Sequence, residues 1–241
     1  MKNIVFLFLV GLSLATCISK KSSKSNLELL QKIKLNIAEP SGITAFNNNL
    51  YIVSDKNGSF YSTSLEGEIL KKHSTKFNDL EGITIQESSH TIWLVEESER
   101  KLVKLDSLGN RIRKIKVKGK QQSKNNGLEG VCFVESENSL YVVNENSPKQ
   151  LLQLNLKGKI TNKFNLDFSK DISGICFDKT SNSFWIVSDE SESVYNISKK
   201  GMLIKSYKIP VNKAEGIVIY NNKMYVVSDS ENNLYIFKIP S

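Results

Sequence analysis

The chain has 241 residues, of which 39% are hydrophobic and 24% are charged, and its formal net charge is +8. This length and composition suffice to bury one sizeable core, so a second domain is not required. The positive charge does not indicate nucleic-acid binding, because the N-terminus has the features of an exported chain, which rarely meets nucleic acid.

The N-terminus has the layout of a secretory signal. Lys2 precedes an apolar run from Ile4 to Leu14, which is too short to span a bilayer comfortably, and small residues then lead to Cys17. The sequence LATC resembles a bacterial lipobox, from which Thr16 departs. We therefore expect residues 1–16 to be a lipoprotein signal peptide and Cys17 to be acylated, for example by palmitate. Ordinary secretion with cleavage nearby is the alternative.

The segment after Cys17 predicts a flexible linker. Ile18 to Asn26 is rich in serine and lysine and has almost no apolar side chains to pack. We expect residues 17–26 to be a tether that joins a lipid anchor in the bacterial inner or outer membrane to a domain at residues 27–241. Several buried acyl methylene groups, each contributing about 0.8 kcal/mol, would hold the protein there, facing the periplasm or the exterior.

The rest of the chain is an internal repeat of four short β runs. Each copy begins with an acid close before a glycine, as in NDLEGITI from Asn78, and an aromatic or bulky run such as LYIVSD follows. The glycines are spaced by 40 to 48 residues, and polar turns separate the runs. This rhythm is typical of β-propeller blades and predicts an all-β fold of five four-stranded blades. The five glycines are Gly42, Gly82, Gly130, Gly174 and Gly216.

The fifth copy ends at Ile239 without a fourth run. Leu27–Asn36 precedes the first copy and has no partner of its own. We expect this N-terminal strand to complete the fifth blade, which closes the ring and leaves no long unpaired edge.

Strand order predicts that two sets of acids meet at one mouth of the ring. In an antiparallel blade numbered outward from the axis, the start of the first strand and the end of the second share a face. The first set is Glu39, Asp79, Glu81, Glu129, Asp171 and Glu215; the second is Asp55, Glu96, Glu97, Glu145, Asp189 and Asp229.

A ring of carboxylates without histidine or cysteine favours Ca²⁺ over zinc or iron. We expect Glu81, Glu129 and Glu215 to bind Ca²⁺ near the axis, with Glu39, Asp79 and Asp171 as close neighbours. The mouth would then bind a ligand with Asp55, Glu97, Asn144, Asp189 and Asp229. The alternative is that these side chains only cap turns, as Asp and Ser often do at strand ends.

The remaining cysteines and the histidines offer little chemistry at this mouth. Cys132 and Cys176 occupy equivalent places in neighbouring repeats, where we expect free buried thiols rather than a disulfide. His90 falls in a hairpin on the opposite face and His73 in an outer strand, so neither is placed as a general base.

The first and second repeats, EPSGITAFNNNLYIVSD and DLEGITIQESSHTIWLVEE, resemble the SdiA-regulated family over residues 33 to 239. The resemblance implies a bacterial envelope propeller with no established reaction. More distantly, the acid-Gly element is similar to the inner-strand glutamate of calcium-dependent gluconolactonase and paraoxonase propellers. Those have six blades and place asparagines around the ion, whereas here five are counted and only Asn144 sits comparably.

Three functions remain open from the sequence. The first is a membrane-anchored monomeric binding module that holds Ca²⁺ and a small ligand. The second is a Ca²⁺-dependent hydrolase of lactones or phosphate esters, and the third is a scaffold for another envelope protein. No nucleophile motif such as G-x-S-x-G occurs, and both histidines fall away from the mouth, which favours binding over catalysis.

Overall fold

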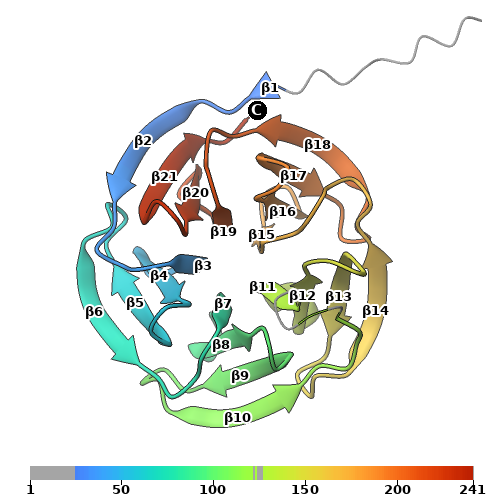
Figure 1. Cartoon of the computed structure of the whole chain (residues 1–241). Coiled ribbons are helices and arrows are strands. Elements are labelled where there is room, and N and C mark those ends of the chain that lie inside the picture. The colour runs from blue at the N-terminus through green and yellow to red at the C-terminus, as the bar shows by residue number, and fades with distance from the viewer. Residues whose placement is uncertain (1–24, 122, 124–126, 241) are drawn as a thin grey trace, which may run out of the picture.

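The alternating runs form antiparallel strands in five sheets, which are arranged as a five-bladed β-propeller (Figure 1). The computed structural model describes residues 25–121, 123 and 127–240. Within these residues the one helical element is a 3-10 turn at Glu135–Glu137, and no helix is long and apolar enough to cross a membrane. The predicted fold class is therefore confirmed.

Each blade is a meander whose first strand lies at the axis and whose fourth lies at the rim. Blade 1 contains β3 (Pro40–Phe46), β4 (Asn49–Ser54), β5 (Ser59–Thr63) and β6 (Ile69–Ser74). Blade 2 contains β7 (Leu80–Gln86), β8 (Thr91–Glu96), β9 (Lys101–Leu105) and β10 (Arg111–Lys116). Blade 3 contains β11 (Leu128–Val134), β12 (Ser139–Asn144), β13 (Gln150–Leu154) and β14 (Ile160–Asn165).

The last two blades each take a strand from the N-terminal segment. Blade 4 contains β15 (Gly174–Asp178), β16 (Ser183–Ser188), β17 (Ser193–Ile197) and β18 (Leu203–Lys208), with β1 (Ser25–Asn26) at its outer edge. Blade 5 contains β19 (Ala214–Tyr220), β20 (Lys223–Ser228), β21 (Asn233–Lys238) and β2 (Leu29–Lys34).

The predicted closure of the ring is confirmed. Strand β2 pairs antiparallel with β21, in a register that places Leu29 opposite Phe237 and Lys34 opposite Asn233. Strand β2 from the N-terminal segment and β21, the last strand, therefore share one sheet, and β21 is not left as an unpaired edge. Among the described residues, all the strands lie within residues 25–238.

The first strand among the described residues begins at Ser25, two residues before the expected start of the domain. Ser25 and Asn26, the end of the segment interpreted as a tether, pair in parallel with Tyr207 and Lys208 of β18. Leu27, which follows them, is 7% exposed and joins the core that blades 4 and 5 share. Cys17 and residues 18–24 lie outside the described residues.

The core lies between the blades. Side chains of the second and third strands are buried on both faces of each sheet, as in β8 and β16, because neighbouring blades stack face to face. Trp93, Phe60 and Phe184 are completely buried in these interfaces. The outermost strands are mostly exposed, as in β10, where Arg and Lys side chains face the solvent.

Small residues are required where the five inner strands meet at the axis. A Cβ atom added to Gly82 would lie 2.6 Å from the carbonyl oxygen of Glu129 in the next blade, and one added to Gly174 would lie 2.3 Å from that of Glu215. The equivalent atoms at Gly42, Gly130 and Gly216 would also come within 2.7 Å of the next blade's backbone. The repeated glycine therefore lets the inner strands of neighbouring blades approach closely.

The predicted places of the thiols and the histidines are also confirmed. Cys132 and Cys176 are free and buried in neighbouring inner strands. His73, on β6, stacks on Phe60 with ring centroids 4.4 Å apart. His90 lies in the hairpin between β7 and β8, on the face away from the acids.

Candidate functional site

Backbone hydrogen bonds bring the two sets of acids together at one mouth of the ring. The N–H of Asp55, just after β4, donates to the carbonyl of Glu39, just before β3, at 3.1 Å. The same bond joins Glu97 to Asp79 in blade 2 at 3.0 Å. Each bond ties the end of a second strand to the start of the first strand of its own blade. Equivalent bonds in blades 3 and 5 join Glu145 to Gly127 and Asp229 to Lys213.

The resulting hollow, which we call the acidic funnel, has a volume of about 260 Å³. Nine carboxylates line it, and Lys213 is the single basic residue among the described lining residues. Ser41 and Ser173 complete the lining. The carboxylates are Asp55, Glu81, Glu129, Glu145, Asp171, Asp189, Glu190, Glu215 and Asp229.

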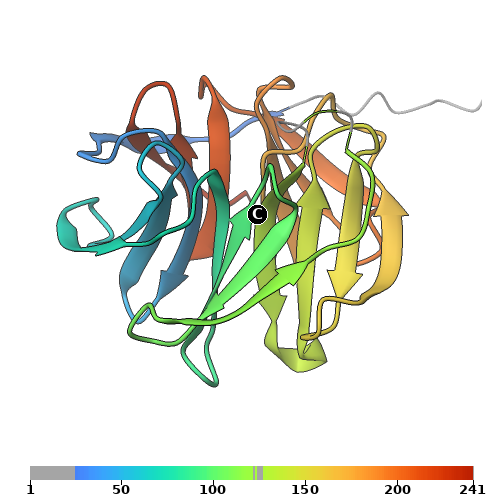
Figure 2. The same ribbon diagram turned by 60° about the horizontal axis from the view of Figure 1, so that its bottom comes forward.

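The glycine ring closes the bottom of the funnel. The space between the glycines and the flanking Glu81, Glu215 and isoleucines is only about 10 Å³, about the smallest volume that holds one water molecule. The funnel is therefore a blind site that opens on one face of the disc, and the hairpins between first and second strands form the other face (Figure 2).

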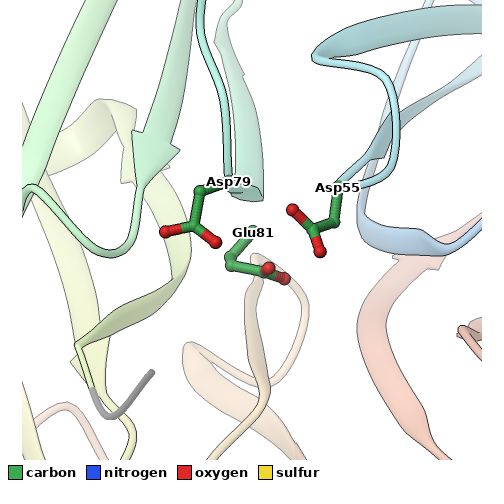
Figure 3. Close-up of side chains that lie close together, drawn as sticks. All are labelled: Asp55, Asp79 and Glu81. Atoms are coloured by element: carbon green, nitrogen blue, oxygen red, sulfur yellow. The ribbon is translucent and has the colours of Figure 1, made fainter. Parts of the chain in front are cut away.

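Carboxylate oxygens gather in two groups within this region. In the first group, Asp55, Asp79 and Glu81 offer oxygens that lie within 4.8 Å of one another, and Figure 3 shows the three side chains converging. In the second group, Glu97, Glu129 and Glu145 do the same. Each group combines the end of a second strand in one blade with the start of the next blade, and the second group adds Glu145, which follows the second strand of blade 3.

The predicted trio of Glu81, Glu129 and Glu215 does not fall within one of these groups. Glu81 belongs to the first group and Glu129 to the second, while Glu215 belongs to neither. All three line the funnel. The carboxylates of the trio still interact, since in addition to burial both Glu81 and Glu215 raise the pKa of Glu129.

Burial and mutual repulsion raise the pKa values of these acids. Burial raises the pKa of Glu97 and of Glu215 to about 7, and the charge of Asp189 adds to the effect at Glu215. The pKa values of Glu81 and Glu129 are raised well above the usual range, first by burial and then by neighbouring carboxylates, of which Asp55 contributes most at Glu81 and Glu81 contributes most at Glu129. Burial also raises the pKa values of Asp55 and Asp229. At neutral pH the funnel is thus an unfavourable place for so many negative charges.

Other predicted residues are engaged in local contacts. The carboxylate of Glu39 pairs with Lys56 at 2.9 Å at the rim, outside both groups. Asp171, which is buried, accepts hydrogen bonds from the hydroxyls of Ser188 and Ser173 and from the backbone N–H of Glu190.

Two of the acids cap turns, as the alternative interpretation expected. Asp171 does so through Glu190, and Asp79 accepts the backbone N–H of Ser98 at 2.6 Å. Asp79 also belongs to the first group, so capping and membership of a carboxylate group coexist in one side chain.

Asn144, one of the predicted ligand-binding residues, has an amide whose oxygen and nitrogen are both already hydrogen-bonded. It is buried, its side-chain oxygen accepts a hydrogen bond from Arg100, and its NH₂ group donates to the carbonyls of Asn146 and Pro148. Its role in the structure is to hold the loop after β12. Glu96, from the second set, faces outward and pairs with Lys114 of β10.

Sequence reasoning missed two charged residues of the funnel. Lys213 pairs with Asp189 across the boundary of blades 4 and 5 at 2.7 Å, and Glu190 lines the mouth next to Asp189. The signal for Lys213 was present, since it occupies in KAEG the place of Asp79 in DLEG. At that boundary the charge of Lys213 opposes the rise in the pKa values of Glu215 and Asp229.

Comparison with solved structures shows the fold. Glutaminyl cyclase of Myxococcus xanthus is 12% identical over 89% of this chain and 98% of its own, with a TM-score of 0.71. Virginiamycin B lyase of Staphylococcus aureus is 20% identical over 88% of this chain and 74% of its own, with a TM-score of 0.52. A chain of the nidogen–laminin complex is 14% identical, with a TM-score of 0.59, over 82% of this chain and 74% of its own.

These identities are low, so the likenesses concern the propeller architecture alone. No curated protein matches the chain at a significant level. The profile of the SdiA-regulated family, in contrast, matches residues 18–241, which include every blade. The match agrees with the resemblance carried by the acid-Gly and strand-end motifs of the repeats. The chain belongs to the SdiA-regulated family.

Proposed function

We propose that this protein is a lipid-anchored binding module of the bacterial cell envelope whose acidic funnel holds Ca²⁺ and, through it, a small ligand. The observation that carries the proposal is the convergence of nine carboxylates, with Lys213 as the one basic residue among the described lining residues, in a funnel of about 260 Å³. Such a cluster is costly when its charges are uncompensated, and a divalent cation would compensate them.

The donor set fits Ca²⁺ in kind and in spacing. All the candidate donors are oxygens, and in each group the three carboxylate oxygens lie within 4.8 Å of one another. Ca²⁺ takes six to eight oxygen ligands at about 2.3 to 2.6 Å in flexible geometry. One oxygen of Asp229, at the same mouth, is buried and has no hydrogen-bond partner among the described residues.

Ca²⁺ should therefore raise the melting temperature of residues 18–241. Binding to the folded state stabilises it by about 2.7 kcal/mol at a hundredfold excess over Kd. Mg²⁺ should raise the melting temperature less, because it requires a tighter octahedral set of ligands. Thermal melts after thorough chelation, with and without each ion at neutral pH, measure this.

Substitutions in the two carboxylate groups test which residues of the funnel bind the ion. Glu81→Gln removes a carboxylate from the first group and Glu129→Gln one from the second, and the double variant should lose the calcium-dependent shift. Glu39→Gln is the matched control, since Glu39 lies at the same mouth but pairs with Lys56 outside both groups. Wild-type protein that shows no calcium-dependent shift would sink the proposal.

A Ca²⁺-dependent hydrolase is the second candidate, because a carboxyl with a pKa of about 7 suits general acid–base catalysis at neutral pH. Glu97 and Glu215 both have such a pKa. A screen against lactones and phosphodiesters, with Ca²⁺ or with EDTA, separates this candidate from simple binding. Turnover that EDTA and Glu97→Gln both abolish would favour it.

A further inference from the structure

A groove lined by lysines, which we call the basic groove, lies at the rim of the ring between the outer strands of blades 2 and 3. It has a volume of about 680 Å³. Strand β10 and the residues after it contribute two of its lysines, and β14 with the turn before it contributes three. The lysines are Lys116, Lys118, Lys157, Lys159 and Lys163, and all five are exposed.

The turn that carries two of these lysines is packed against blade 2. A Cβ atom added to Gly158 would lie 2.2 Å from Cγ2 of Ile115, so the turn touches β10 directly. The side-chain oxygen of Asn155 accepts the backbone N–H groups of Lys157 at 3.0 Å and of Lys159 at 3.1 Å. The backbone that carries these two lysines is therefore held in place before any ligand arrives.

The register of blade 3 places a further lysine on the same side. Lys163 stands opposite Leu152 in the antiparallel pair of β13 and β14. Leu152 belongs to the hydrophobic cluster that also contains Ile115 and Val117 of blade 2. Because directly opposed residues share a face of the sheet, Lys163 lies on the face of blade 3 that is turned toward blade 2.

The protein does not neutralise the charges of the basic groove. Other lysines of blade 2 pair with acids, as Lys114 does with Glu96 and Lys101 with Glu99. No Asp or Glu is among the described residues that line the groove, and none of its lysines forms an ion pair with a described residue. Nine carboxylates lie instead at the axis, in the acidic funnel. The positive charge at this part of the rim is thus available to an anion.

The side chains of the basic groove favour phosphate. Lysine binds phosphate as a compact point charge, whereas arginine suits the paired recognition of a carboxylate, and no arginine is among the described lining residues. A phosphate group carries up to about two negative charges at neutral pH, so a few such groups match five lysines. The described lining also has no aromatic ring on which a nucleobase would stack.

From these observations we propose that the basic groove binds a soluble anion that carries several phosphate groups. A hollow of this size admits a small molecule or one segment of a chain, whereas the surface of a bilayer is flat. Strand β1 lies across the ring from β10 (Figure 1), so a membrane anchor joined to β1 leaves the groove free to meet soluble molecules. The site lies outside the acidic funnel and does not depend on Ca²⁺.

The test is isothermal titration calorimetry of residues 18–241 with tripolyphosphate, in EDTA to exclude Ca²⁺. We expect saturable binding of one tripolyphosphate per chain. The double variant Lys157→Gln and Lys159→Gln should weaken binding at least about tenfold. Lys71→Gln with Lys72→Gln, on the exposed strand β6, is the matched control, because it removes the same charge from blade 1. It should leave the affinity unchanged at physiological salt, where charges more than about 8 Å away are screened.

A second pair of substitutions approaches the groove from its two strands. Lys116→Gln with Lys163→Gln should also weaken binding at least about tenfold. All these lysines are exposed, so the melting temperatures of the variants should match that of wild type. Absence of saturable binding, or equal affinity in the groove variants and in the control, overturns the proposal.

Two further ligands test the chemistry and the source of the phosphate. Citrate, which carries carboxylates only, should bind at least about tenfold more weakly than tripolyphosphate, and equal affinity overturns the preference for phosphate. The same protein should not sediment with vesicles of equimolar phosphatidylglycerol and phosphatidylcholine. Sedimentation that the substitutions at Lys157 and Lys159 abolish, without binding of tripolyphosphate, would assign the groove to lipid headgroups and overturn the soluble ligand.

Discussion

At the scale of single residues, the axial glycines set how close the blades can approach. An added Cβ at Gly82 would lie 2.6 Å from the Glu129 carbonyl oxygen and 3.0 Å from the Val131 nitrogen, and both are backbone atoms that cannot rotate away. Gly82→Ala should therefore lower the free energy of unfolding by about 1–3 kcal/mol, the usual cost of overpacking. Urea unfolding followed by circular dichroism measures it.

An exposed substitution provides the control for this prediction. Lys71→Ala, on the outer strand β6, should change the free energy of unfolding by less than about 0.5 kcal/mol. Comparable losses in the two variants would contradict the view that contact at the axis, and not general sensitivity of the ring, explains the glycine.

The buried acids predict a pH dependence of stability. Burial raises the pKa values of Glu97 and Glu215 from 4.5 to about 7 in the folded state. Between those values the folded state binds more protons than the unfolded state, so the free energy of unfolding falls as the pH rises through this window. In chelator, the melting temperature should thus decrease from pH 5 to pH 8.

Substitution of the two acids tests the origin of that slope. The double variant Glu97→Gln and Glu215→Gln should melt with a clearly shallower pH dependence, because two of the groups that retain protons are gone. Glu39→Gln, at the rim, should keep the wild-type slope. An unchanged slope in the double variant would mean that other groups cause the effect.

At the scale of elements, the N-terminal strands have unequal roles. Strand β2 pairs with β21 along five residue pairs, whereas β1 adds two residues to the edge of blade 4. Deletion of residues 18–36 should leave β21 as an unpaired edge and cause aggregation or a large loss of stability. Size-exclusion chromatography and thermal melts of the truncated proteins measure this.

Shorter deletions test which of the N-terminal residues contribute to the stability of the fold. Removal of residues 18–24 should leave the melting temperature unchanged, because it keeps β1, the first strand among the described residues, which starts at Ser25. Removal of residues 18–26 should lower it slightly through the loss of the two pairs with Tyr207 and Lys208. Equal tolerance of all three deletions would argue against closure of the ring by β2.

At the scale of the whole molecule, the proposed lipid anchor predicts where the propeller resides. Cys17→Ser should leave an unprocessed precursor or a soluble form, because acyl chains would no longer hold the N-terminus at the membrane. Fractionation of cells and gel mobility measure the outcome. A variant that stays in the membrane with normal mobility would refute lipidation at Cys17.

The sequence by itself determined the architecture. Five copies of the glycine at spacings of 40 to 48 residues, with four β runs each, are enough to predict five blades. The missing last run, together with the unpaired Leu27–Asn36, predicted closure by the N-terminal strand. These features can be predicted because the same local pattern recurs in every repeat. A chance match at a single residue therefore does not change the prediction.

Only the tertiary structure decided which acids share a group. In sequence, Glu81, Glu129 and Glu215 are equivalent and look like partners, but neither carboxylate group holds more than one of them. Asp55 comes within reach of Glu81 instead, because the end of one blade's second strand adjoins the start of the next blade.

The contacts that individual polar side chains make could likewise not be predicted from the sequence. The amide of Asn144 is hydrogen-bonded to Arg100 and to its own loop, and Lys213 forms an ion pair with Asp189 at the boundary of blades 4 and 5. Periodicity specifies which end of a strand a residue occupies. The distance from that residue to its neighbour depends on how the blades pack around the axis, which no single repeat encodes.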